Sequence, residues 1–463
     1  MRVLLLTLAV MCAAERVSAT SGRLVIQDVT VIDVTGGPAQ PHRTVVVQDD
    51  RIQEIYSPGA IVAAAKGDVR INAKGKFLIP GLWDMHVHTV FGDWFPGSKE
   101  ITLPLFIANG VTGVRDMGGE LDVLLQWRRE IAAGTLLGPR MLIAGPMLDG
   151  PKPRFPSSIA VATSEDGRRA VDDLKARGVD FIKLQSLIPR EAVFAIADEA
   201  KKKGISFVGH VPDAVRASEA SNAGQKSFEH LIGIFEGSSP LESEFLKGPK
   251  SPGKFLASYD PARASRLFAL LANNHTWQCP TLVWERGGNL IEEVDGAHDE
   301  RAKYIPAYWK DVTWKRFIED IRRDNSDDLH TRRRFVEKEL EVVNLMHREG
   351  VRFLAGTDTA PGVYVLPGFS LHEELTRFVA AGFTPLEALQ TATLNPAKFL
   401  ELETQLGTIE KGKLADLVLL DGNPIDDIRN TRKIAAVIVN GKLFSRPDLD
   451  KLLGDVESTA KTR

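Results

Sequence analysis

The chain has 463 residues, of which 43% are hydrophobic and 26% charged, and its net charge is −3. This composition is typical of a globular protein with a large core, so neither disulfides nor repeats are needed to explain its stability. The near-neutral charge and the lack of a long basic run exclude nucleic acid as an expected partner.

Residues 1–19 are typical of a secretory signal peptide. Arg2 precedes an apolar run at 3–14, and small residues follow at 17–19, so we expect cleavage after Ala19. The run is shorter than the ~20 residues that cross a bilayer, so no stable membrane anchor is expected. The alternative is a buried N-terminal strand or helix. We therefore predict a secreted or periplasmic protein.

The segment that follows, 20–76, has short runs of Val, Ile and Thr separated by Gly/Pro-rich and Asp-Asp turns, which predict strands. Similar runs return near the C-terminus, where Asn440-Gly441 is a strong hairpin signal. We predict that 20–76 and 405–447 together form a small β-sandwich. Residues 448–463 form a charged tail in this interpretation.

Between these pieces, residues 77–404 alternate short apolar runs with amphipathic stretches, which indicates parallel strands linked by helices. Eight such units favour an α/β fold with a closed (β/α)8 TIM barrel. Helices are expected at 120–133, 164–177, 190–203 and 214–223. The expected strands are 77–88, 111–116, 140–145, 179–185, 205–210, 226–231, 276–283 and 351–356.

A long insertion at 285–349 interrupts this alternation. It holds several aromatic residues among many charges, and two stretches have helical spacing before Gly350. These helices could pack on the outside of the barrel or cover the mouth of its active site, and the sequence leaves both readings open.

His86 and His88 stand two residues apart at the end of the first predicted barrel strand. Because side chains alternate along a strand, both imidazoles face the barrel interior, where they could bind a metal ion. Four further residues, Lys183, His210, His230 and Asp358, also fall at the C-terminal ends of predicted strands, where barrel active sites lie. Together they predict a metal site.

The motifs around these residues resemble the amidohydrolase superfamily, and in particular its imidazolonepropionase-like branch, which includes prolidase-like (Xaa-Pro) dipeptidases. The resemblance extends from Arg23 to Phe444. The motifs are IPGLWDMHVHT, GVTGVRDMGG, FIKLQ, GHV, FEHL, LAGTDTA and the C-terminal LNPAKFLELETQLGTIEKGKLADLVLLDG.

The resemblance implies two divalent metal ions, with zinc the default from the histidine ligands. His86, His88 and Asp358 would bind the more buried ion, and His210 and His230 the more exposed one. Lys183 would carry a carbamate that bridges both, because burial and nearby positive charge lower its pKa enough for the neutral amine to react with carbon dioxide. Imidazolonepropionase itself lacks this lysine and uses one metal, so Lys183 argues against that activity.

In the implied mechanism the two metals activate a shared water as hydroxide, and Asp358 acts first as a general base and then as a general acid. We predict cleavage of C–N bonds in a small-molecule substrate, such as a dipeptide or an N-acyl amino acid. Arg286 or Tyr364 could hold the substrate carboxylate. Trp94, Arg115 and Trp284 are further candidates for the pocket wall.

Two alternatives stay open from the sequence. The same binuclear site could serve a lactonase, carboxylesterase or organophosphate hydrolase. The chain could also be a non-catalytic metal-binding protein, although neither Asp358 nor any expected ligand is missing. Cys279, the single cysteine after the signal, is expected to be a packed core thiol. Association into a homo-oligomer is compatible with the sequence.

Overall fold

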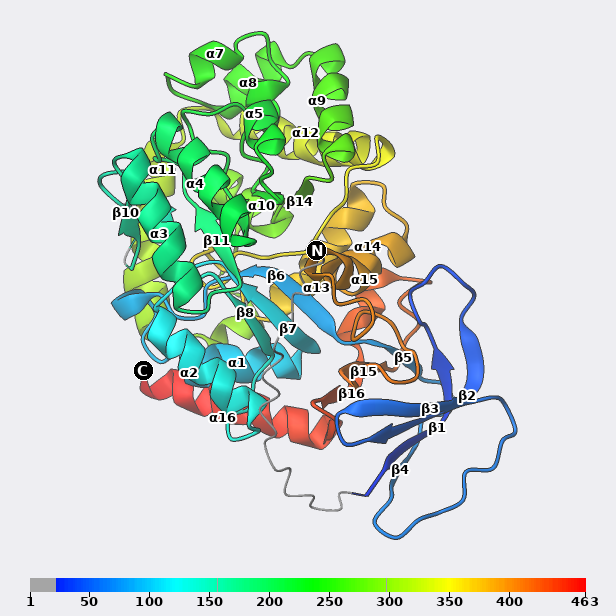
Figure 1. Ribbon diagram of the computed structural model, residues 1–463. Helices are drawn as coiled ribbons and strands as arrows, with labels where there is room; N and C mark the ends of the chain where they lie inside the picture. The colour runs from blue at the N-terminus through cyan, green and yellow to red at the C-terminus, as the bar shows by residue number, and fades with distance from the viewer. Residues whose placement is uncertain (1–21, 156, 297) are drawn as a thin grey trace, which may run out of the picture.

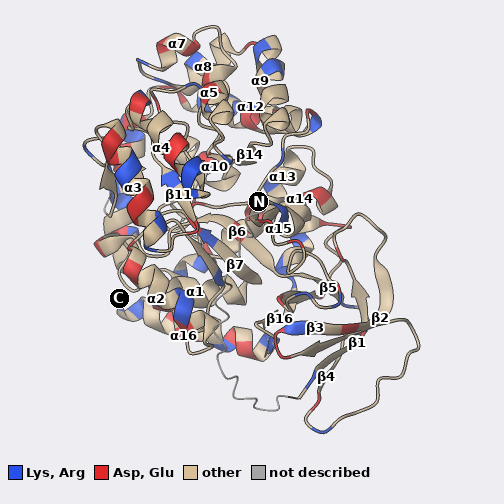
Figure 2. Ribbon diagram, viewed as in Figure 1, with Lys and Arg blue, Asp and Glu red and all other residues tan. Residues whose placement is uncertain are grey.

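The computed structural model describes residues 22–155, 157–296 and 298–463. The predicted signal peptide lies outside the described residues. Figure 1 shows a larger part in which helices surround parallel strands, and a smaller part built from the blue N-terminal strands and the orange C-terminal strands. Basic and acidic positions are interspersed along outer helices such as α3 (Ser164–Ala176) and α4 (Arg190–Lys203) (Figure 2).

The smaller part is one mixed sheet of eight strands from both ends of the chain. Its order is β17-β16-β15-β5-β1-β2-β3, and β4 also pairs with β1. The strands predicted for the small β-sandwich are thus joined in one continuous hydrogen-bonded sheet. The strands are β1 (Leu24–Val31), β2 (Gln40–Gln48), β3 (Arg51–Tyr56), β4 (Val69–Asn72), β5 (Phe77–Pro80), β15 (Leu417–Leu420), β16 (Ile434–Val439) and β17 (Lys442–Ser445).

Strand β15 shows why the C-terminal motif is apolar without alternation. Leu417 and Leu419 pack into the sheet's own core, whereas Val418 and Leu420 belong to the core of the larger part. Because side chains alternate between the faces, both faces of β15 are buried. Its neighbour β5 covers the first third of the strand predicted at 77–88, so residues 77–80 belong to this sheet and not to the barrel.

The larger part contains two sheets of parallel strands. Their orders are β6-β7-β8 and β10-β9-β11-β12-β13-β14. Seven of the predicted barrel strands have a counterpart here; β7 has the predicted bounds, and the others are shorter than predicted. The bounds are β6 (Leu82–Val87), β7 (Val111–Asp116), β8 (Arg140–Ile143), β9 (Leu148–Asp149), β10 (Ile159–Ala160), β11 (Phe181–Leu184), β12 (Ser206–Gly209), β13 (Ser227–Glu229) and β14 (Trp277–Cys279).

The eighth predicted strand, 351–356, is not a regular strand, but its backbone bonds to both neighbours. Gln278 N donates to Arg352 O at 2.9 Å on one side, and Met85 N donates to Ala355 O at 2.8 Å on the other. This segment thus lies between β14 and β6. The strand predicted at 276–283 ends earlier than expected, because helix α10 (Leu282–Asn289) begins within that range.

The helices follow the predicted alternation. Four predicted helical ranges contain α2 (Leu121–Ala132), α3, α4 and α5 (Ala217–Asn222). The other helices of eight or more residues are α1 (Ser98–Ala108), α9 (Pro261–Asn273), α11 (Lys315–Asp324), α12 (Leu329–Arg348), α13 (Phe369–Ala380) and α16 (Arg446–Thr462), and the shorter ones are α6 (Ile234–Gly237), α7 (Glu242–Phe245), α8 (Pro252–Ser258), α14 (Pro385–Thr391) and α15 (Leu394–Leu400). None of the helices in the described ranges is both long and apolar enough to span a membrane.

The insertion at 285–349 packs against two different surfaces of the larger part. Trp309 and Trp314 are fully buried, and their indole N–H groups donate to Pro96 O and Ala360 O at 3.0 Å. Pro96 lies in the segment after β6, and Ala360 lies in the segment after 351–356. The part of the insertion around Trp309 and Trp314 therefore packs at one end of the parallel sheets. Helix α12 instead packs on the outside, through Val342, Val343 and Met346.

The expected tail at 448–463 is the main part of helix α16, which lies beside α1 (Figure 1). Leu449, Val456 and Ala460 are buried on one face of this helix. The charged composition of the segment therefore describes its solvent face, while the apolar face stabilises the packed helix.

Candidate active site

Six predicted site residues meet at the carboxyl ends of the parallel strands. His86 lies in β6 and His88 directly follows it, Lys183 lies in β11, and the other three residues, His210, His230 and Asp358, follow β12, β13 and the 351–356 segment. All but His210 are buried, and His210 is half-buried. Parallel strands place these ends on one side of the fold, which is why residues spread over more than half of the chain converge.

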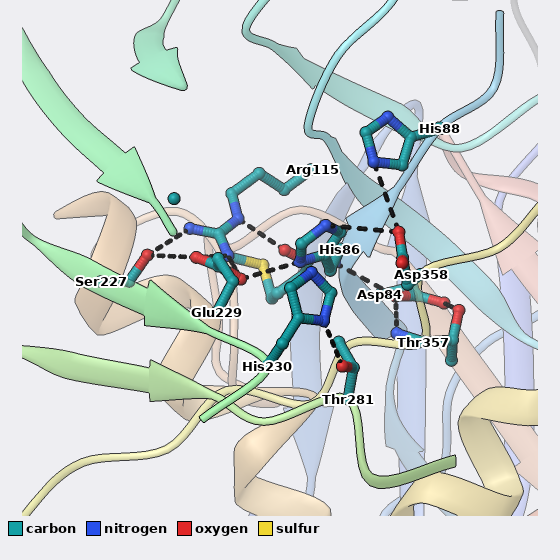
Figure 3. A network of polar contacts seen from close by, with 12 residues as sticks. Asp84, His86, His88, Arg115, Ser227, Glu229, His230, Thr281, Thr357 and Asp358 are labelled. Atoms are coloured by element: carbon teal, nitrogen blue, oxygen red, sulfur yellow. Dashed lines mark hydrogen bonds and ion pairs between the residues drawn. The ribbon is translucent and has the colours of Figure 1, made fainter. Parts of the chain in front are cut away.

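Asp358 links the two histidines of the first strand. Its Oδ1 lies 3.4 Å from His86 Nε2 and 3.3 Å from His88 Nε2 (Figure 3). Ligand atoms of these three residues all lie within 4.8 Å of one another, as a shared metal ion requires. His86 Nε2 is buried and has no hydrogen-bond partner among the described residues.

The remaining histidines continue this cluster. The ring centroids of His86 and His230 are 4.6 Å apart, and those of His230 and His210 are 5.1 Å apart. Burial is the main cause that lowers the pKa of His86, His210 and His230 well below the ordinary value. These imidazoles are therefore neutral near pH 7, which is the form that binds a metal.

Each imidazole is held through its Nδ1 atom. His86 Nδ1 donates to Glu229 at 2.9 Å, and His88 Nδ1 donates to the carbonyl of Gly118 at 2.8 Å. In the same way, Nδ1 of His210 pairs with the Ser186 hydroxyl and Nδ1 of His230 with the Thr281 hydroxyl, at 2.8 and 2.6 Å. Such contacts orient a ring and leave its Nε2 lone pair for a metal ion.

Lys183 is the unusual member of the cluster. Its Nζ is buried and has no hydrogen-bond partner among the described residues. Burial lowers its pKa to about 8, against the opposing effects of Glu229 and Asp358. An unpaired ammonium in this position is costly, whereas a neutral amine, or a carbamate facing cations, suits the site. The donor set thus fits a site for divalent metal ions.

A buried ion pair between Arg115 and Glu229, which the sequence analysis missed, orients His86. Arg115 donates to both carboxylate oxygens of Glu229 at 2.9 and 3.0 Å, and the Ser227 hydroxyl donates to Glu229 at 2.6 Å (Figure 3). The sequence suggested Arg115 as a residue of the pocket wall, and this is wrong. Its guanidinium group is fully buried and pairs with Glu229. The signal for Glu229 was a carboxylate inside an apolar strand, next to His230.

Asp84 is a second missed residue. It stands two positions before His86, so it faces the same interior. Its carboxylate accepts hydrogen bonds from the Thr357 hydroxyl at 2.7 Å and from the Thr357 N–H at 3.0 Å, which holds the turn that presents Asp358. Burial raises the pKa of Asp84 to about 7.

A cavity of about 770 Å³ opens beside His230. Its wall includes Trp284, one of the expected pocket residues, and the exposed Arg154, which the sequence analysis missed. Trp94 instead packs against neighbouring aromatic rings. Arg286 and Tyr364 line a separate cavity, which none of the six clustered residues reaches, so their predicted role in binding substrate stays a prediction.

Cys279 is buried beside the cluster, and burial raises the pKa of its thiol well above the ordinary value. This agrees with the expected packed core thiol. Its Sγ lies within 4.8 Å of ligand atoms of His86 and Glu229, but a protonated thiol is a poor ligand.

Comparisons with known proteins agree with this geometry. The chain is 24% identical to ochratoxinase from Aspergillus niger over 89% of its own length and 85% of that protein. Among solved structures, it resembles a bottromycin amidohydrolase with a TM-score of 0.73 and 25% identity, covering 94% of this chain and 90% of that one. It also shares the fold of a Xaa-Pro dipeptidase with a TM-score of 0.68 and 22% identity, covering 92% of this chain and 100% of that one.

The profile of the amidohydrolase family matches residues 77–444, a span that begins at β5 and includes all six clustered residues. The chain therefore belongs to the amidohydrolase family.

Proposed function

We propose that this amidohydrolase is a binuclear metal enzyme that cleaves the C–N bond of dipeptides or N-acyl amino acids. The observation that carries the proposal is the cluster of four imidazoles, one carboxylate and one unpaired buried lysine at the strand ends. The proposal includes a closed (β/α)8 barrel, which the backbone bonds of the 351–356 segment to both neighbours support.

His86, His88 and Asp358 would hold one ion, and His210 and His230 the other. Two zinc ions bound there would lower the pKa of a water and polarise the substrate carbonyl. Lys183 would join the two halves of the site as a carbamate: its neutral Nζ forms a bond to the carbon of carbon dioxide and releases one proton. The amine has no other partner to satisfy it.

Asp358 is the candidate acid–base group. Its carboxylate lies next to His86 and His88, and 10% of its side chain is exposed, whereas the side chain of Glu229, which also contacts His86, is fully buried. Asp358 can therefore take a proton from the attacking water and deliver it to the leaving nitrogen. Glu229 is committed to Arg115 and His86 and acts only by positioning.

The cavity beside His230 supports an amino acid derivative as substrate. Its apolar wall includes four aromatic rings, those of Phe235, Phe255, Trp284 and Phe335. One cation in the wall, Lys250, already pairs with Asp213 at 2.8 Å and with Glu236 at 3.1 Å. Aromatic rings of this kind suit a large apolar side chain.

Arg154 is the free cation of this cavity within the described residues. Its side chain has no hydrogen bond or ion pair, while its backbone N–H donates to Asp149 at 3.0 Å. The next residue, Phe155, packs against Phe91 and Trp94, with ring centroids 5.6 and 6.0 Å away. The backbone bond to Asp149 and the packing of Phe155 thus fix the loop that carries Arg154. The guanidinium group of Arg154 is available for a substrate carboxylate.

The test is metal analysis followed by a substrate panel. Protein comprising residues 20–463, purified in bicarbonate buffer, should contain about two metal ions per chain and hydrolyse N-acyl amino acids with large apolar side chains. Faster turnover of matched esters, lactones or phosphotriesters would assign the site to the alternative hydrolases. Absence of metal after reconstitution would refute the proposal.

The role of Arg154 is tested by Arg154→Met, with Lys152→Met on the same exposed loop as the matched control. We expect KM for a free-carboxylate substrate to rise about ten-fold with little change in kcat, as for a lost binding contact. KM for the same substrate capped as a C-terminal amide should not change. Equal effects on both substrates would contradict this role.

A further inference from the structure

A second cavity, of about 470 Å³, lies between helices α10 and α13. None of the six predicted metal ligands lines it. Helix α10 separates it from the cavity beside His230: Val283, Arg286 and Gly287 face the second cavity, whereas Trp284 and Glu285 face the first. The helical repeat explains how one short helix serves two cavities, since residues three or four apart share a face.

Three arginines in the wall of this second cavity lack a partner. The guanidinium groups of Arg286 on α10, Arg377 on α13 and Arg432 form neither a hydrogen bond nor an ion pair with any group in the described part of the chain. Arg286 and Arg377 are half-buried, and Arg432 is exposed at the rim. Arginines are mostly solvated at protein surfaces, but here three unpaired guanidinium groups share the wall of one cavity and two of them are half-buried.

None of the four carboxylates that line the cavity forms an ion pair with these three arginines. Each of the four already has a basic partner within contact distance. The pairs are Asp299–Arg301, Glu373–Arg301, Glu293–Arg333 and Asp295–His298.

The arginines also act on one another. The pKa of Arg377 is lowered, first by burial and then by the positive charge of Arg286. The carboxylates of Glu374, Glu373 and Glu339 oppose this effect, but Glu374 accepts hydrogen bonds from the backbone N–H groups of Leu282 and Val283, and Glu373 pairs with Arg301. Two like charges held together in a partly buried cavity repel, and a bound anion would relieve the repulsion.

We propose that this cavity binds a small oxyanion, either a phosphate or a carboxylate group, through Arg286, Arg377 and Arg432. The planar guanidinium group presents two parallel N–H donors, which match the oxygens of either group. The hydroxyls of Tyr364, Ser370 and Thr376 in the same wall add donors for a neutral part of the ligand. This inference concerns binding and does not depend on the proposed hydrolase activity.

The experiment is calorimetric titration of the full mature chain with inorganic phosphate and, separately, with succinate. The variant Arg286→Gln/Arg377→Gln should lose at least about ten-fold in affinity, because two charge-assisted contacts are removed. The control Arg334→Gln removes an exposed charge on α12, outside the cavity, and should bind like the wild type. Binding of phosphate alone or of succinate alone identifies the preferred group.

Two further variants locate the bound anion and replace the double variant if it does not fold. His210→Asn weakens the candidate metal site, so unchanged binding in this variant places the anion away from that site. If the double variant does not fold, Arg432→Gln removes a rim charge with little effect on packing and should weaken binding about three-fold. No binding of either anion to the wild type, equal affinity in the arginine variants, or loss of binding in His210→Asn would each overturn the proposal.

Discussion

Replacing Lys183 by methionine should stabilise the metal-free protein, although it removes a residue of the candidate active site. The side chain is buried without a partner, and its pKa in the folded state is about 8, against 10.5 for an ordinary lysine. Below pH 8 the lysine is protonated in both states, and the difference in pKa corresponds to about 3 kcal/mol of unfavourable free energy in the folded state. Methionine has a similar length and carries no charge, so Lys183→Met should raise the free energy of unfolding by about this amount at pH 7.

The pH dependence gives the sharper test. Between about pH 8 and 10.5 the unfolded chain binds more protons than the folded protein, so the stability of the wild type rises with pH. The advantage of Lys183→Met should therefore be full at pH 7 and almost absent near pH 10.5. Urea unfolding of chelator-treated, bicarbonate-free protein measures both quantities. The control Lys175→Met changes an exposed lysine and should show neither effect. A less stable Lys183→Met, or a difference that does not change with pH, would refute the reasoning.

Four other changes probe the candidate site and the predicted signal peptide. Asp358→Asn should lower kcat by about 100-fold or more while the fold is retained, as far-ultraviolet circular dichroism would show; near-normal rates would exclude the acid–base role. Glu229→Gln should lower the free energy of unfolding by about 3 kcal/mol, measured in urea, because Arg115 keeps a buried charge without its counter-ion. Thr281→Val should weaken metal affinity about ten-fold in a chelator competition, and unchanged affinity would mean that the contact to His230 does not orient the ring. Deleting residues 1–19 should leave a folded protein with full metal content, and failure to fold would make the segment structural.

The chain alone predicted the α/β alternation because that signal is local. The helices α2, α3, α4 and α5 lie within predicted ranges, since the spacing of apolar residues and the flanking turns are written in neighbouring residues. The six clustered residues were also predictable. Each is a polar side chain at the end of an apolar run, and parallel strands bring such ends together.

The limits of individual elements were less predictable, because they depend on pairing partners far away in the chain. The stretch 77–88 reads as one strand, but β5 pairs with β15 and β1, whereas β6 pairs with β7. The tail at 448–463 reads as charged, yet its three buried positions meet a surface of α1 that the local sequence does not describe.

The sequence by itself determined which side chains could bind metal, because their identity and their place at strand ends are local properties. Only the tertiary structure decided which side chains orient the histidines. Glu229, Ser186 and Thr281 each lie in or after a different strand than the histidine that they contact. The tertiary structure also decided which cavity each candidate substrate residue faces. Trp284 and Arg286 are two positions apart on one helix and line different cavities, because residues two apart on a helix point about 160° from each other.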